Sequence, residues 1–178
     1  MTKINESVLI EELQELARAG DLKAQLQLAS GFCKGTFGKR DWHTAFTWYE
    51  VAANQGSSIA QYNLASMYLN GEGCIRDLSS ARHWFEKCAA QGDVDAQFNL
   101  GLLYDKGEIE AQDLLQAAHW YKLAAENGSA RAQYDLALMF ELGRGLEQNL
   151  ELALFWYEQA SIQGVGRALE KVELLRSL

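Results

Sequence analysis

Residues that commonly carry out chemistry are few in this sequence of 178 residues. The only histidines are His43, His83 and His119, and the last two each stand directly before a tryptophan. A general base needs a reacting partner within hydrogen-bond reach, and a zinc site needs further ligands at short spacing. Neither accompanies these histidines. The sequence therefore predicts no catalytic residues, no metal site and no cofactor.

The three cysteines, Cys33, Cys74 and Cys88, are odd in number and show no CxxC or Cys/His spacing. Because disulfides are rare in reducing compartments and cysteine is often buried, we expect free thiols and a cytoplasmic location. Two glycine pairs, in Gly71–Gly73 and Gly143–Gly145, lack the strand and the Lys-Ser/Thr of a phosphate loop. We interpret them as turns, since glycine readily adopts a positive φ.

The composition argues against several classes of partner. Apolar residues make up 48% of the chain, too many for intrinsic disorder, and the net charge is −8. An acidic surface repels phosphate backbones and is not attracted to anionic membranes, so we expect no nucleic-acid partner. No apolar stretch approaches the roughly 20 residues of a membrane-spanning helix, so we also expect no membrane insertion.

The strongest signal is a repeat of 36 residues without insertions or deletions. A tryptophan, a glutamine and two glycines recur at this interval, and an alanine recurs along a still longer series. The recurring residues are Trp48, Trp84, Trp120 and Trp156; Gln25, Gln61, Gln97 and Gln133; Gly35, Gly71, Gly107 and Gly143; Gly56, Gly92, Gly128 and Gly164; and Ala24, Ala60, Ala96, Ala132 and Ala168. This period indicates stacked units rather than one compact core.

Each unit reads as two helices. Apolar residues fall on one face of each segment, at spacings of three and four, and no segment alternates as a strand would. The residues that precede each second helix are expected N-caps, and the glycines that follow it are expected C-caps. The expected N-caps are Asp41, Asp77, Asp113 and Asn149.

These patterns predict an all-α solenoid of four 36-residue helix-pair repeats, with half-repeat helices at both ends. We expect a single domain over residues 1–178. It would comprise an N-terminal capping helix at 6–19, repeats at 21–56, 57–92, 93–128 and 129–164, and a C-terminal capping helix at 165–178. Half repeats at the ends would cover the terminal apolar faces, which solenoids need for solubility.

The block Ala60–Ala65 (AQYNLA), followed by Tyr68, Gly71–Gly73, Trp84 and Ala89–Gly92, resembles the Sel1-like repeat. Corresponding blocks in the other units extend the resemblance over residues 21–164. Sel1-like repeats are relatives of tetratricopeptide repeats, so the resemblance implies a right-handed superhelix whose first helices line a concave surface. It also implies adaptor or scaffold roles. The first unit departs from the pattern at Thr36-Phe37-Gly38 and the third at Glu108-Ile109, so we expect these two loops to be individual.

The candidate binding surface is the side of the first helices opposite their inward anchors. Four rows run along it, beginning in the first unit with Lys23, Leu26, Ser30 and Cys33. Mixed aromatic, aliphatic and charged groups suit an extended peptide. We expect aromatic anchors, a second row beside them, and charges that orient the partner, the acidic ones favouring a basic partner. The expected aromatic anchors are Tyr62, Phe98 and Tyr134, the second row is Ser66, Leu102 and Leu138, and the orienting charges are Asp105, Glu141 and Arg131. Packing between adjacent first helices is the alternative role of the three rings.

The leading hypothesis is a non-enzymatic protein–protein interaction scaffold that binds a peptide or helix of another protein in its concave groove. One alternative is a hydrolase-like or penicillin-binding activity of the kind claimed for some relatives, with Ser30, Ser66 or Cys33 as nucleophile. The other is a structural module that forms a homodimer through its end helices, where leucines such as Leu169 and Leu174 gather.

Overall fold

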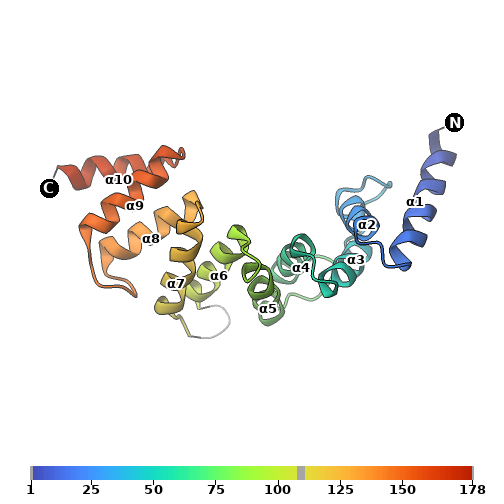
Figure 1. The fold of residues 1–178 in the computed structure, drawn as a ribbon, viewed down its shortest axis with the longest axis horizontal. Helices are drawn as coiled ribbons and strands as arrows, with labels where there is room; N and C mark the ends of the chain where they lie inside the picture. Colours follow the sequence, from blue (N-terminus) through green and yellow to red (C-terminus); the bar gives the residue numbers. More distant parts are fainter. Residues whose placement is uncertain (1, 108–110, 178) are drawn as a thin grey trace. The chain divides into compact units, whose positions relative to one another are not determined.

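The computed structural model describes residues 2–107 and 111–177, with side chains from Leu9 onward. These ranges form ten α-helices and contain no β-strand (Figure 1). The helices are α1 (Thr2–Arg18), α2 (Leu22–Lys34), α3 (Trp42–Asn54), α4 (Ser58–Asn70), α5 (Leu78–Ala89), α6 (Val94–Lys106), α7 (Leu114–Glu126), α8 (Ala130–Leu142), α9 (Leu150–Ile162) and α10 (Gly166–Arg176). The predicted all-helical array of helix pairs is confirmed.

The chain divides into two compact units, Met1–Gln91 and Gly92–Leu178. The first contains α1 and two helix pairs, which we call the first repeat (α2 and α3) and the second repeat (α4 and α5). The other contains the third repeat (α6 and α7), the fourth repeat (α8 and α9) and α10.

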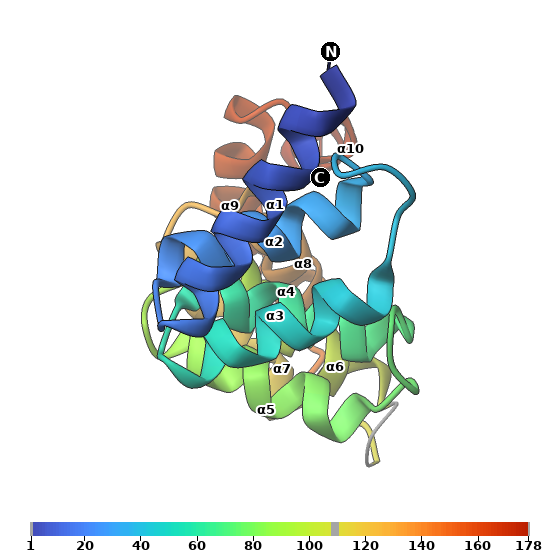
Figure 2. The same cartoon turned by 90° about the vertical axis from the view of Figure 1, so that its right-hand side faces the viewer.

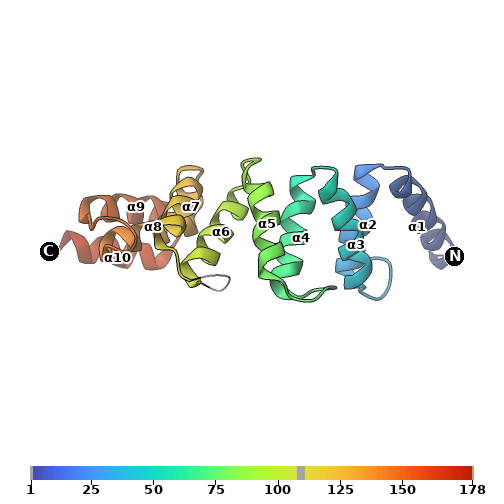
Figure 3. The same cartoon turned by 90° about the horizontal axis from the view of Figure 1, so that it is seen from below.

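Within each unit, every helix packs on the one before it. Figure 3 shows α2, α3, α4 and α5 of the first unit side by side, and Figure 2 shows α1 lying against α2. The same holds for α6 to α10. Paired alanines such as Ala52 and Ala53 are fully buried where these helices meet, and their small side chains permit close approach.

The helix ends follow from local side-chain chemistry. Asp41 accepts a hydrogen bond from the Thr44 backbone N–H at 3.0 Å and caps α3, and Asn149 accepts one from Leu152 at 2.9 Å to cap α9. Asp77 and Asp113 cap α5 and α7 in the same way. The predicted N-caps are therefore confirmed. A glycine with positive φ follows each of these helices, and Gly56, with φ of 92°, is one example.

The recurring glutamine ties neighbouring helices together. Gln61 of α4 is buried, donates from Nε2 to the Ala53 carbonyl of α3 at 3.3 Å, and accepts from Gln91 Nε2 at 2.7 Å. Gln25 makes the equivalent donation to the Ala17 carbonyl of α1 at 3.0 Å. A buried amide is expensive unless both of its ends are bonded. The arrangement therefore fixes the glutamine and places α1 where a second helix of a preceding repeat would stand.

The second glycine of the loop after α4 allows a close approach to the preceding repeat. A Cβ at Gly73, which has φ of 73°, would overlap the Trp42 carbonyl at the start of α3. The first repeat instead has Phe37 at this position, so its loop differs from the loop after α4, as its sequence predicts. Glu108 and Ile109, the departure expected in the third repeat, lie outside the described residues.

Candidate functional site

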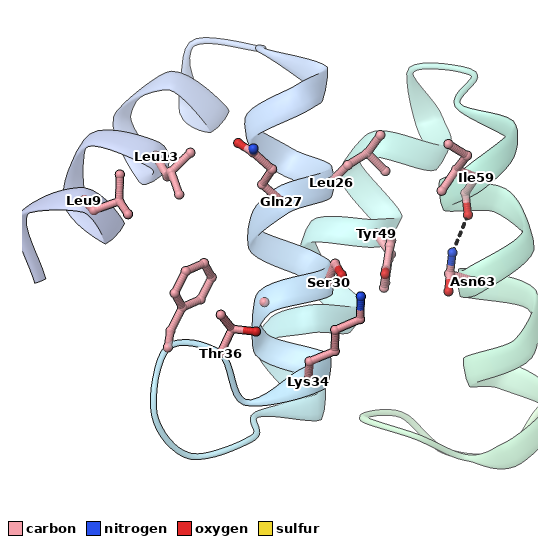
Figure 4. Close-up of a pocket in the computed structure, with 12 residues that line it drawn as sticks. Leu9, Leu13, Leu26, Gln27, Ser30, Lys34, Thr36, Tyr49, Ile59 and Asn63 are labelled. Carbon is pink, nitrogen blue, oxygen red and sulfur yellow. Dashed lines mark hydrogen bonds between the residues drawn. The ribbon is translucent and has the colours of Figure 1, made fainter. Parts of the chain in front are cut away.

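An open pocket of about 660 Å³ lies on the first unit, between α1, α2 and α4 (Figure 4). Its walls come from α1, α2, the loop after α2, one side chain of α3 and two of α4. They are mostly apolar, and several polar side chains stand among them. The lining residues are Leu9, Leu13, Leu26, Gln27, Ser30, Gly31, Lys34, Thr36, Phe37, Tyr49, Ile59 and Asn63.

The loop wall exists because Phe37 takes the place of a core side chain. The helix position of Gly31 is occupied by Met67, Leu103 and Met139 in the other repeats, and all three are buried. A Cβ at Gly31 would overlap the Phe37 ring, which packs edge-on against Phe32 with centroids 5.5 Å apart. The ring therefore fills the volume that glycine leaves, and it holds the loop against α2.

A second departure from the repeat keeps the space open. In the other three repeats the ring of a first helix packs on the ring of the second helix. Tyr62 meets Phe85 with centroids 5.7 Å apart, and Tyr134 meets Tyr157 at 5.4 Å. The first repeat has Leu26 at this position, facing Tyr49. Because a leucine side chain is smaller than a phenol ring, the space between Leu26 and the neighbouring helices stays open and forms part of the pocket.

The polar groups of the pocket include a hydroxyl pair, an ammonium group and the side-chain amides of Gln27 and Asn63. The Ser30 hydroxyl lies in hydrogen-bond contact with the Tyr49 phenol, and burial raises the pKa of Tyr49 to about 12. Lys34 runs back along α2 toward Ser30 (Figure 4). Asn63 donates from Nδ2 to the Ile59 carbonyl at 2.7 Å (Figure 4).

The aromatic residues predicted as anchors do not share one environment. Phe98 is 5% exposed, packs against Tyr121 with centroids 5.8 Å apart, and is covered by the Arg131 guanidinium at 4.6 Å. Its ring thus belongs to the core of the second unit. Tyr62 and Tyr134 are half-buried and keep part of their rings accessible.

The charged residues predicted to orient a partner already have intramolecular partners. Asp105 pairs with Arg144 at 2.9 Å. Arg131 pairs with Asp95 at 2.8 Å, while Glu141 accepts from Lys171 at 2.7 Å and from the Tyr157 hydroxyl at 2.6 Å. These contacts consolidate the second unit. Of the remaining predicted residues, Ser66, Leu102 and Leu138 are half-buried on their helices.

Comparison with known proteins assigns the repeat. The Sel1 repeat model matches residues 22–57, 58–93, 94–129 and 130–165, one residue later than the boundaries set by the sequence pattern. The chain belongs to the Sel1 repeat family. No curated protein sequence matches it.

Solved structures of other Sel1 repeat proteins share the fold. A protective antigen present in uropathogenic Escherichia coli strains is 33% identical with a TM-score of 0.89; the match covers 94% of this chain and 36% of the antigen. A Sel1 repeat protein from Oxalobacter formigenes is 29% identical with a TM-score of 0.77, over 92% of this chain and 73% of that protein. An immunity protein from Pseudomonas aeruginosa is 24% identical with a TM-score of 0.52, over 89% and 58%, which shows the fold alone. This chain thus spans about a third of the antigen.

Sequence reasoning identified Leu26 and Ser30 as members of the candidate surface, and the structure places both at one pocket. It did not identify Phe37 or Gly31. The signal was available in the Sel1 repeat pattern itself, because both positions differ in type from their counterparts in the other repeats.

The remaining chemistry-bearing residues do not converge on a site. Among the described residues, no group of three or more His, Cys, Asp or Glu side chains is arranged to hold a metal ion. His83 and His119 are exposed and lie edge-on to Trp84 and Trp120. Within the same ranges, no helix has both the length and the apolar character needed to cross a bilayer.

Proposed function

We propose that this Sel1 repeat protein is a non-enzymatic interaction scaffold that binds a peptide segment of another protein in the pocket of its first unit. The observation that carries the proposal is the pocket itself, whose apolar rim is unusually accessible. Leu9 is 52% exposed and Ile59 is 61% exposed, on opposite sides of α2. Apolar side chains that border an open depression are typical of surfaces that bind a partner.

The shape of the pocket favours a peptide segment. It runs across α2 from α1 to α4, so an occupant would touch three helices in succession. Gln27 and Asn63 lie on its two sides and offer amide groups that can bond to a peptide backbone (Figure 4). A pocket of this volume accommodates one or two large side chains.

The chemistry of the candidate nucleophiles supports a non-enzymatic role. The Ser30 hydroxyl is hydrogen-bonded to the Tyr49 phenol. Because this phenol stays protonated at neutral pH, it cannot act as the base that removes the serine proton. Burial raises the pKa of the Cys33 thiol, which opposes formation of the thiolate. Neither group is activated by its surroundings.

The proposal is tested with the substitution Leu26→Tyr, which places in the first repeat the ring type found in the others and fills the pocket. Both wild type and variant serve as bait in a lysate of the source cell, and captured proteins are identified by mass spectrometry. We expect specific partners on wild type and their loss from the variant. Leu138→Tyr is the matched control, because it makes the same change on α8, outside the pocket.

Circular dichroism establishes that both variants are folded. If folded Leu26→Tyr captures the same partners as wild type, the pocket is not the binding site. If wild type captures none, the scaffold proposal itself is contradicted.

A further inference from the structure

The pocket contains a charged group that forms no ion pair within the described part of the chain. Lys34 lies at the end of α2, and no acidic side chain of the described residues forms an ion pair with it. By contrast, Arg131, Arg144 and Lys171 of the second unit are each paired with a carboxylate. The free ammonium group of Lys34 therefore stands beside an apolar surface and is available to a ligand.

Lys34 is the charged residue among those that line the pocket in the described part of the chain. Residues 22–54, which form the first repeat, contain Lys23, Lys34, Lys39 and Arg40 but only Asp41 and Glu50 as acidic residues. Asp41 is used as the cap of α3. On the other side of the pocket α1 carries Glu11, Glu12 and Glu15, so the preference for an acidic ligand comes from Lys34 itself rather than from its surroundings.

We propose that the occupant is an internal segment of another protein in which a large apolar side chain lies next to an aspartate or glutamate. The apolar side chain enters the space between Leu13, Leu26 and Phe37, and the carboxylate pairs with Lys34. This inference rests on the proposed function and adds the chemistry of the ligand.

Each part of the pocket has a role in this recognition. Removing a leucine or phenylalanine side chain from water supplies about 1.5–3 kcal/mol. Lys34 is exposed, so the ion pair adds less affinity than the apolar contact, but it selects an acidic neighbour over a basic one. A fatty acid shares the carboxylate and the apolar chain, but it cannot use the amide groups of Gln27 and Asn63.

The test is a selection of random twelve-residue peptides displayed on phage, with the full chain as bait. Three baits are compared: wild type, Lys34→Glu, and Lys39→Glu. Lys39 is exposed and lies outside the pocket, so the last bait carries the same change in charge at a position that does not line the pocket. A peptide selected on wild type is then measured against all three baits and against Leu26→Tyr by fluorescence polarisation, with and without decanoate as competitor.

We expect peptides from wild type and Lys39→Glu to combine a large apolar residue with an adjacent acidic residue. Lys34→Glu should select basic neighbours instead, and it should bind the wild-type peptide at least about ten-fold more weakly, as expected for a reversed charge. Identical preferences on wild type and Lys34→Glu would overturn the inference, as would displacement of the peptide by decanoate at equal concentration.

The outcomes separate this inference from the proposed function. Peptides that lose binding on Leu26→Tyr but not on Lys34→Glu would leave the scaffold standing and refute the acidic ligand. If no peptide is enriched on wild type, or if the enriched peptides also bind Leu26→Tyr, the peptide-binding pocket fails together with the inference.

Discussion

Replacing Asp135 by asparagine should stabilise the protein at neutral pH and remove part of its pH dependence. Asp135 occupies the repeat position of Asn63 and Asn99. Each of those asparagines donates from Nδ2 to the carbonyl four residues earlier, at 2.7 Å and 2.8 Å. An ionised aspartate has no proton to donate to the Arg131 carbonyl, so it occupies a half-buried position without that bond.

The size of the effect follows from the environment of the carboxyl group. Burial, with a smaller contribution from the charge of Asp105, raises the pKa of Asp135 to about 6, although the charge of Arg131 opposes the shift. The phenols of Tyr121 and Tyr157 also face it, and Arg144 neutralises part of the Asp105 charge. Relative to the ordinary value of 3.8, a folded pKa of about 6 corresponds to roughly 3 kcal/mol lost when the group is ionised.

The sign of the pH dependence is determined by the direction of the shift. Because the folded pKa lies above the unfolded one, the penalty is complete above about pH 6 and disappears as the pH falls toward 4. Asp135→Asn should therefore raise the free energy of unfolding by about 1–3 kcal/mol at pH 7.5, with a much smaller gain at pH 4.5.

Urea denaturation followed by circular dichroism at pH 4.5, 6 and 7.5 measures this difference. Glu147→Gln, at an exposed position of the same unit, is the control for the loss of one negative charge. A gain of equal size at every pH would refute the role of ionisation. Destabilisation at pH 7.5 would show that the carboxylate has a stabilising partner.

Three further predictions concern the packing of the repeats. Gly31→Met should destabilise the protein by about 1–3 kcal/mol because the Phe37 ring occupies the site, while combining it with Phe37→Gly should restore stability, measured as the coupling energy of a double-mutant cycle in urea. Gly73→Ala should cost at least about 1 kcal/mol more than Gly56→Ala, since both have positive φ but only Gly73 meets a neighbouring carbonyl; equal melting temperatures would contradict this. Gln61→Leu should lower stability by about 1–2 kcal/mol in thermal denaturation, because it removes the bond to the Ala53 carbonyl and the bond from the Gln91 amide.

The sequence alone was sufficient for the repeat, the helix pairs and their ends. Asp41 and Asp113 accept hydrogen bonds from backbone N–H groups two or three residues later, so their capping roles can be predicted from neighbouring residues in the sequence. The types of the recurring residues then indicated the family. The constant period indicated the stacking, because equivalent residues in successive units must meet equivalent neighbours. The buried state of Gln61 could also be expected from its recurrence, although its two bonding partners could not.

Only the tertiary structure decided which residues of the candidate surface are free. A helical wheel gives the direction in which a side chain leaves the helix axis, but it does not show which other residues occupy the space around that side chain. Phe98 is covered by Arg131, and Asp105 is neutralised by Arg144, which is 39 residues away. Phe37 reaches from a loop into the space left by Gly31, and together with Leu26 this exception to the repeat produces the pocket. Such contacts depend on distances between separate elements, which periodic spacing does not contain.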